Sequence, residues 1–370
     1  MSAAGPFADP LAPLRPYVLN DLPAVSASWV AGVLGDHPSL YSRSPAMWNA
    51  AFAALDVPAV YLPFDVPPER VDDFVAACRA APALLGFNVT VPYKERVLVQ
   101  LDGVDADAEA IGAVNTVLRT PEGKLLGTNT DGAAALEVVR QLSDSASAGD
   151  RSRSLLLLGA GGAARAVGVA VTRGMPGTAI VLCNRRPDRA EETARIIRQA
   201  GGEVTVVRPD ELDRALGDAG ILVNASSVGM AGPVHSDDSV TWLEPFSPLA
   251  PADPPRIPPS QVAGALPPVE WWQQAWPGIA RNLEVSLRRA LRLHAGAPVL
   301  DLIYAPPESV LLKHARWTGH TVMNGEAVLI TQAVEAFMRL CAAIGEERLL
   351  ATARPLVEQA MTKAMRAPRG

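Results

Sequence analysis

Leu155–Leu158 is a short apolar run that leads directly into Gly159-Ala160-Gly161-Gly162-Ala163-Ala164, and an amphipathic helical pattern begins at Arg165. A strand, a glycine turn and a helix in this order form the context in which a dinucleotide-binding fingerprint has physical meaning. Gly159 permits the tight turn, Gly161 lets the backbone approach a pyrophosphate, and the small Ala164 lets helix and strand pack closely. The helix N-terminus then faces the phosphates. A glycine-rich loop that binds no ligand could have the same sequence, so the flanking residues must distinguish a dinucleotide site from such a loop.

The flanking sequence alternates between strand and helix patterns. Predicted strands lie over residues 154–158, 178–182, 203–207 and 220–224, and predicted helices over 163–174, 188–200 and 210–217. The alternation resumes with a strand over 299–304 and a helix over 308–314, and this pattern is typical of a doubly wound α/β sheet. Residues 230–298 interrupt it with many prolines and four tryptophans, and only Ile279–His294 has clear helical periodicity there.

A second alternation precedes the first. Strands are predicted over 28–35, 59–64 and 84–89, which implies a small, largely parallel sheet. Ser44 is predicted as the N-cap of a helix with Pro45 in its first turn, after a loop over 36–42. Further predictions are helices over 67–81, 105–111 and 133–142, a hairpin over 113–129, and two closing helices over 326–343 and 346–366. Residues 1–27, rich in Ala, Pro and Ser, are expected to form a surface extension.

Composition limits the class of protein. A chain of 370 residues suits two domains, and 49% hydrophobic with 19% charged residues allows a substantial core. A net charge of −6 and a pI of about 5.5 argue against nucleic acid or an anionic membrane as partner. Cys78, Cys183 and Cys341 show neither metal spacing nor a disulfide framework, so we expect no metal and a reducing cytoplasm. We identify no signal peptide and no apolar run of the length that a membrane span needs.

The end of the second strand of the glycine-turn region carries three arginines, Arg185, Arg186 and Arg189, about 20 residues after the glycines. This is where such folds read the adenosine ribose, and arginine suits the 2′-phosphate of NADP. A solvated basic helix start is the alternative, but positive charge at a helix N-terminus opposes the helix dipole unless an anion is bound. Asp188 keeps NAD open as the cofactor.

Two residues at the ends of strand-like segments are candidates for proton transfer. Lys94 taken alone reads as a surface lysine, and Asp131 as a helix N-cap. Together they lie where α/β folds place ligand sites, and a lysine oriented by a carboxylate can move the proton of a hydroxyl/ketone pair. Ser42 and Ser44 are either helix caps or donors to a substrate carboxylate. Asn115, a polar residue inside a strand pattern, is suited to binding substrate hydroxyls.

Several motifs in order resemble the shikimate dehydrogenase family, which includes quinate/shikimate dehydrogenases. The resemblance covers about residues 29–230 and 299–345. The matching stretches are Ser42-Arg43-Ser44-Pro45, Asn49-Ala50-Ala51-Phe52, Gly86-Phe87-Asn88-Val89-Thr90-Val91-Pro92-Tyr93-Lys94, Gly112–Thr116, Asn129-Thr130-Asp131-Gly132, Gly159–Ala164, Asn224-Ala225-Ser226-Ser227-Val228-Gly229-Met230, Asp301-Leu302-Ile303-Tyr304 and Gln332-Ala333.

The resemblance implies reversible, NADP-dependent reduction of 3-dehydroshikimate to shikimate, with Lys94 and Asp131 as the catalytic pair. It also implies a substrate site made of Ser42, Ser44, Thr90, Asn115, Tyr304 and Gln332. The implied cofactor residues are Gly159, Ala160, Gly161, Gly162, Ala163, Asn184, Arg185 and Arg189, with Met230 and Gly325 beside the nicotinamide.

The family's two-domain form implies the domain organisation that we expect. An N-terminal α/β substrate domain would span residues 28–131 and 321–370, with C-terminal helices packing back on it. A Rossmann NADP-binding domain would span 132–320, with an insertion over 233–298. The expected partner is a small ring acid, and the expected assembly is a monomer or homodimer.

Departures from the family pattern keep alternatives open. Tyr41 and Trp48 stand where the family usually has histidines, and Ala305 and Asn324 also depart from it. Tyr41 and Trp48 are expected to add bulk beside the carboxylate loop, which leaves a differently decorated ring, quinate or an amino analogue, open as the substrate. A quinate/shikimate dehydrogenase using NAD or NADP is therefore one alternative. A non-enzymatic dinucleotide-binding regulator is the other.

Overall fold

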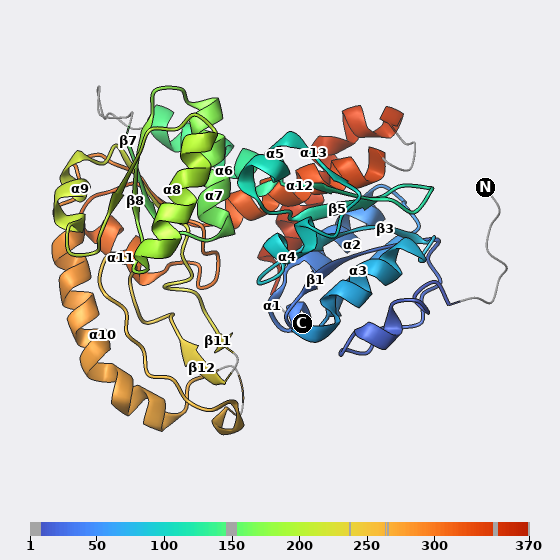
Figure 1. The fold of residues 1–370 in the computed structure, drawn as a ribbon, viewed down its shortest axis with the longest axis horizontal. Coiled ribbons are helices and arrows are strands. Elements are labelled where there is room, and N and C mark those ends of the chain that lie inside the picture. The colour runs from blue at the N-terminus through green and yellow to red at the C-terminus, as the bar shows by residue number, and fades with distance from the viewer. Residues whose placement is uncertain are drawn as a thin grey trace. The chain divides into compact units, whose positions relative to one another are not determined.

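The computed structural model describes residues 9–145, 154–236, 238–262, 264, 266–342 and 347–368. Contacts divide the chain into two compact units (Figure 1). Unit 1 is Met1–Asp131 with Ile330–Gly370, and unit 2 is Gly132–Leu329. Residues 321–329, which we expected in the first domain, cluster with unit 2.

Unit 1 contains a mixed sheet of six strands in the order β2-β1-β3-β5-β6-β4. The first half is parallel, because β1 pairs with both β2 and β3 in that sense, whereas β5 pairs antiparallel with β3 and β6. Every residue of β3 is buried, which explains why its sequence is apolar apart from Asn88. The strands are β1 (Trp29–Gly35), β2 (Ala59–Asp65), β3 (Leu84–Val89), β4 (Gly103–Val104), β5 (Thr116–Arg119) and β6 (Leu125–Thr128).

The helices of unit 1 include the C-terminal pair, as the resemblance implied. Helix α13 packs against α2, and Phe337 of α12 lies 5.2 Å from the rings of both Trp48 and Phe52 of α2. The elements are η1 (Arg15–Tyr17), α1 (Pro38–Tyr41), α2 (Ser44–Ala54), η2 (Pro68–Arg70), α3 (Val71–Arg79), α4 (Lys94–Leu98), α5 (Ala106–Ile111), α12 (Glu326–Ala342, which begins in unit 2) and α13 (Glu347–Arg366).

Three local expectations for unit 1 were wrong. Residues 36–42 contain the one-turn helix α1. Arg43, rather than Ser44, occupies the N-cap position of α2, and Ser42 Oγ accepts a hydrogen bond from the Ser44 N–H at 3.2 Å. Residues 9–27 are not only a surface extension, because Leu11 and Leu14 are fully buried in the core formed with β1, β3 and α3.

Unit 2 is a doubly wound parallel sheet in the order β14-β13-β10-β7-β8-β9, which confirms the Rossmann prediction. The chain leaves β7 toward β8 and β9 and returns to β10 on the other side of β7. Ligands bind at such a switch point, outside the carboxyl ends of the strands. The strands are β7 (Ser154–Leu158), β8 (Ala179–Cys183), β9 (Val204–Val207), β10 (Ile221–Asn224), β13 (Val299–Asp301) and β14 (Val322–Met323).

The helices of unit 2 are close to the expected pattern outside the insertion. Leu212 and Leu216 of α9, Ala290 of α10 and Leu311 of α11 share one core with the sheet. The helices are α6 (Asp131–Ser145, whose first residue belongs to unit 1), α7 (Gly162–Gly174), α8 (Pro187–Gln199), α9 (Leu212–Asp218), α10 (Val269–Ala290) and α11 (Val310–Trp317). Among the described residues, no helix combines the length and the apolar character of a membrane span.

The insertion has a core of its own. A hairpin of β11 (Pro233–Ser236) and β12 (Ser239–Trp242) precedes α10, drawn in orange in Figure 1. Helix α10 begins ten residues before the expected Ile279 and continues through Pro277. Pro268 and Pro277 flank the first turns of this helix, and for this reason the sequence pattern did not predict them as helical. The core residues are Val240, Trp242, Phe246, Ala252, Ile257, Trp271, Ala275 and Ile279.

A buried carboxylate ties together the ends of β10 and β13. Asp301 accepts hydrogen bonds from Asn224 Nδ2 at 2.9 Å, from Ser309 Oγ at 2.5 Å and from the Ile303 N–H at 3.1 Å. Asn224 Oδ1 in turn accepts from the Ser226 N–H at 3.0 Å. Burial raises the pKa of Asp301 to about 6, although the three hydrogen bonds oppose the shift. This network fixes the loops that leave the carboxyl ends of β10 and β13.

We predict that Leu14→Ala destabilises unit 1 by about 2–5 kcal/mol, because it opens a cavity in a fully buried position. Urea unfolding followed by circular dichroism would measure the loss. The matched control is Leu19→Ala, whose side chain is 55% exposed and whose removal should change stability little. Equal unfolding midpoints for the two variants would contradict the burial of Leu14.

We also predict a pH-dependent stability difference between the wild type and Asp301→Asn. The folded-state pKa of Asp301, about 6, exceeds the ordinary 3.8, so the folded state retains a proton that the unfolded state loses between pH 4 and 6. Stability of the wild type relative to the variant should therefore fall across this window, by up to about 3 kcal/mol. Urea unfolding of both proteins from pH 3.5 to 7.5 tests this, and a constant difference would refute it.

Candidate active site

Lys94 and Asp131 meet in unit 1. Lys94 is the first residue of α4, a few residues after β3, and Asp131 is the first residue of α6, shortly after β6. The Lys94 ammonium donates to Asp131 Oδ2 at 2.6 Å. Their side chains are 23% and 21% exposed, so the ion pair is mostly shielded yet reachable from solvent. A partly buried ammonium beside a fixed carboxylate is suited to giving and taking a proton at a ligand oxygen.

Asn115 holds the other oxygen of the Asp131 carboxylate. Asn115 Nδ2 donates to Asp131 Oδ1 at 2.8 Å, and Asn115 Oδ1 accepts from the Thr130 N–H at 2.9 Å. Gln332 of α12 joins this group, since its Oε1 lies 3.3 Å from Asn115 Nδ2 and its carbonyl accepts from Thr130 Oγ1 at 3.1 Å. The structure therefore brings together four of the predicted residues, Lys94, Asp131, Asn115 and Gln332.

A buried polar chain, which sequence analysis missed, extends from this group toward Ser44. Tyr61 Oη donates to Asn88 Oδ1 at 2.6 Å, Asn88 Nδ2 donates to Thr116 Oγ1 at 2.9 Å, and Thr116 Oγ1 donates to Asn115 Oδ1 at 3.1 Å. Burial raises the pKa of Tyr61, while a hydrogen bond with Ser44 opposes the shift. The sequence signal for this chain was Asn88, a polar residue inside the otherwise apolar strand β3.

The remaining predicted substrate residues of unit 1 lie at the ends of helices and strands. Ser42 follows α1 and Ser44 opens α2. Thr90 follows β3, and its N–H donates to the Leu34 carbonyl at 2.9 Å. Its methyl group leaves no room for a side chain at Gly35, where a Cβ would lie 2.4 Å from Thr90 Cγ2.

Trp48 does not lie beside the carboxylate loop as expected. Its side chain is 1% exposed and stacks on Tyr61 with 4.7 Å between ring centroids. The helical turn of α2 directs it into the aromatic core rather than toward a ligand. Tyr41, in contrast, is 38% exposed.

The glycine turn of unit 2 has the geometry that a dinucleotide phosphate requires. Gly159 has φ +108°, and a Cβ there would lie 2.8 Å from the Ser226 nitrogen. A Cβ at Gly161 would meet nothing within 4 Å, so open space lies beside the N-cap of α7. Thr193 Oγ1 donates to the Ala160 carbonyl at 3.1 Å and fixes the turn. Gly162 and Ala163 begin α7, whose first N–H groups attract an anion.

The predicted ribose residues follow β8. Asn184 Nδ2 donates to the Arg186 carbonyl at 3.1 Å, and Arg186 also lies 3.4 Å from the Asp188 carboxylate. Arg189 lies 3.7 Å from Glu192. Arg185 donates from Nη1 to the Ala252 carbonyl of the insertion at 3.1 Å. Three guanidinium groups at the start of α8 fit a 2′-phosphate better than a bare ribose hydroxyl.

The other predicted residues of unit 2 follow β10 and β13. Met230 is 38% exposed, and Tyr304 lies three residues beyond Asp301. The Gly325 N–H donates to the Ile303 carbonyl at 3.0 Å. A Cβ at Gly325 would lie 2.0 Å from the Leu302 oxygen, so only glycine allows this close approach.

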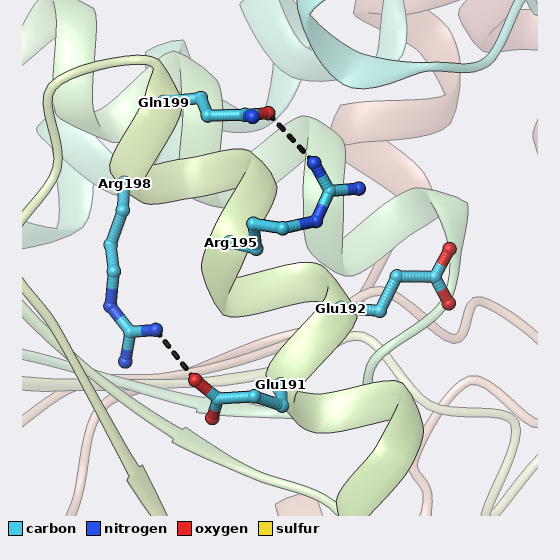
Figure 2. A pocket seen from close by; sticks show the side chains of 5 residues that line it. All are labelled: Glu191, Glu192, Arg195, Arg198 and Gln199. Carbon is cyan, nitrogen blue, oxygen red and sulfur yellow. Dashed lines mark hydrogen bonds and ion pairs between the residues drawn. The ribbon is translucent and has the colours of Figure 1, made fainter.

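A hollow along α8 is not a candidate site. Figure 2 shows its side chains along one helix, with Arg198 paired to Glu191 at 2.7 Å and Arg195 to Gln199 at 3.2 Å. None of the predicted site residues lines it. Mutually paired charges on one helix are typical of a solvated surface.

Comparison with known proteins relates most of this chain to one family. The family model described as "Shikimate dehydrogenase substrate binding domain" matches residues 33–117. A shikimate dehydrogenase (NADP(+)) of Methanopyrus kandleri is 38% identical over 312 residues, 83% of this chain and 88% of that protein.

Solved structures of two related enzymes have the same fold. Shikimate 5-dehydrogenase from Thermus thermophilus in complex with NADP(H) and shikimate is 28% identical, with a TM-score of 0.59 over 91% of this chain and 99% of that chain. Quinate dehydrogenase from Corynebacterium glutamicum in complex with NAD is 27% identical, with a TM-score of 0.62 over 89% and 98% of the two chains. Taken with the 38% identity over most of its length, these matches show that this chain belongs to the shikimate dehydrogenase family.

Proposed function

We propose that this protein catalyses the reversible, NADP-dependent reduction of 3-dehydroshikimate to shikimate, with unit 1 binding the ring acid and unit 2 the cofactor. The observation that carries the proposal is the Lys94–Asp131 ion pair, 2.6 Å long and about one-fifth exposed, in a member of this family. The relatives named for NADP and shikimate support the choice of cofactor and substrate.

Lys94 acts on the proton of the reacting oxygen. Its ammonium donates a proton to the C3 oxygen of the ketone in the reductive direction, and the neutral amine takes that proton back in the oxidative direction. Asp131 orients the amine and stabilises its charged form. Because Asn115 holds the second carboxylate oxygen at 2.8 Å, Asp131 cannot rotate away from Lys94 without breaking that hydrogen bond.

The other polar side chains bind and orient the ring. Ser42 and Ser44 hold the carboxylate at the start of α2, while Thr90, Asn115, Tyr304 and Gln332 bind hydroxyls or the carboxylate. The hydrogen bond from Asn115 to Asp131 and the contact of Gln332 with Asn115 support these roles. Several fixed donors around one small ring place its reacting carbon within a narrow range of positions, which lowers the barrier by orientation.

The cofactor residues of unit 2 fit NADP. The turn from Gly159 to Ala163 and the N-terminus of α7 would hold the pyrophosphate, and Asn184, Arg185 and Arg189 the 2′-phosphate ribose. Met230 and Gly325 would lie beside the nicotinamide. When bound, NADPH supplies the hydride. We further propose a cytoplasmic location, on the basis of three buried cysteines that are far apart in sequence and show no disulfide framework, and a monomer or homodimer.

We predict that Lys94→Ala lowers kcat by about 10²–10⁴-fold, because the proton donor at the ketone is lost. NADP binding, measured by calorimetry, should stay within twofold of the wild type, since Lys94 belongs to the other unit. Lys124→Ala, an exposed lysine of the β5–β6 turn, is the matched control and should retain full activity. Undiminished turnover in Lys94→Ala would refute the assignment of Lys94.

A steady-state assay of shikimate and quinate, each with NADP and with NAD, should give the highest kcat/KM for shikimate with NADP. Higher kcat/KM for quinate or for NAD would instead support the quinate/shikimate dehydrogenase alternative. Binding of NADP without turnover of either acid would point to a dinucleotide-binding regulator.

A further inference from the structure

The insertion contains a loop, Ser247–Ala252, that is held by one buried amide. Asn282 of α10 is 2% exposed, and its Oδ1 accepts from the Ser247 N–H at 2.8 Å. Its Nδ2 lies within hydrogen-bonding distance of three loop carbonyls, at 3.0 Å from Ser247, 3.2 Å from Ala250 and 3.0 Å from Pro251. Both ends of this amide are therefore used to fix one stretch of main chain.

A buried arginine fixes the same loop to α9 and to the segment that precedes it. Arg289 is 8% exposed and donates from Nη1 to the Leu249 carbonyl at 2.8 Å. Its Nη2 donates to the Pro209 carbonyl at 2.8 Å, and its Nε to Asp213 of α9 at 2.7 Å. Leu249 packs in the same core as Cys183, the last residue of β8. The loop is thus positioned relative to the end of β8, where the ribose residues begin.

The loop ends at the carbonyl that Arg185 contacts. Ala252 is 7% exposed, while the Arg185 side chain is exposed and long, so without a tether it would sample many rotamers. The hydrogen bond from Arg185 Nη1 to the Ala252 carbonyl, at 3.1 Å, restricts it. A guanidinium has five N–H donors in a fixed fork, so one bond to the loop leaves others for a ligand.

The charge balance distinguishes Arg185 from its neighbours. Arg186 lies beside the Asp188 carboxylate, and Arg189 beside that of Glu192. Arg185 contacts a neutral carbonyl, so its positive charge stays available for a phosphate dianion.

We infer that the insertion is a specificity element of the cofactor site: its loop Ser247–Ala252, fixed by Asn282 and Arg289, positions Arg185 for the 2′-phosphate of NADP. The inference rests on the proposed use of NADP. Asn282 is a positioning residue that acts through Arg185. Restricting the arginine before the ligand arrives reduces the entropy lost on binding, so the insertion favours NADP over NAD.

Calorimetric titration with NADP and with NAD, in the absence of ring acid, tests the inference. Arg185→Ala should weaken NADP binding by at least tenfold. Asn282→Ala should weaken it by about three- to tenfold and change NAD binding by less than twofold. In the Arg185→Ala background, Asn282→Ala should have no further effect on NADP, because a double-mutant cycle isolates action through Arg185.

Two further variants keep the test decisive. Trp276→Ala removes a 62% exposed side chain from the same helix and should leave both affinities unchanged. If Asn282→Ala does not fold, Pro251→Gly loosens the loop at an exposed position and should weaken NADP binding about two- to fivefold.

Several results would overturn the inference. They are an unchanged NADP/NAD ratio in folded Asn282→Ala or Pro251→Gly, tighter NADP binding in either variant, or an equal loss in the Arg185→Ala background. A wild type that binds NAD as tightly as NADP would also overturn it, even if shikimate is oxidised. A wild type that prefers NADP but turns over no ring acid would refute the proposed function and leave this inference standing.

Discussion

The Asp131 carboxylate, held between the Lys94 ammonium and the Asn115 amide, is the interaction on which the candidate site depends. A mostly buried carboxylate is costly unless both oxygens have partners, so each partner must itself be fixed. Asn115 is fixed by Thr130 and Thr116, and Gln332 of α12 closes the group from the other end of the chain. The Asp131 carboxylate therefore organises residues from segments that are distant in the sequence.

The polar chain from Tyr61 through Asn88 to Asn115 has a similar effect over a longer range. A buried polar group that loses its partner costs more free energy than the hydrogen bond contributed, so each member restricts the next. Ser44, where we propose that the ring carboxylate binds, and Asp131, where the proton is handled, are then connected through rigid strands rather than mobile loops. Trp48 stacks on the aromatic ring of Tyr61 and supports that ring from the side of the core.

Much of the fold could be predicted because its signals are local. Strand runs, the Gly159–Ala164 turn and helix periodicity identified both sheets, and family motifs pointed to Lys94 and Asp131 as partners. Features that depend on distant partners could not be predicted. Nothing near Trp48 indicates that Phe337 covers it, and nothing near Asn115 indicates that Gln332 lies 3.3 Å from its amide nitrogen. The first half of α10 was not predicted because Pro277 normally ends or kinks a helix. Here the helix continues through this proline, and its tertiary packing could not be read from the local sequence.

Unit 1 is built from two segments that are far apart in the sequence, and this affects its folding during biosynthesis. Trp48 and Phe52 emerge from the ribosome early, yet Phe337 and α13, which complete their packing, are made only after the whole of unit 2. At typical elongation rates of about 5–20 residues per second, the 198 residues of Gly132–Leu329 take about 10–40 s to synthesise. Unit 2 is continuous, so it can reach its native state first. The half of the protein that is translated first is thus the last to mature, and its aromatic surface needs protection during that interval.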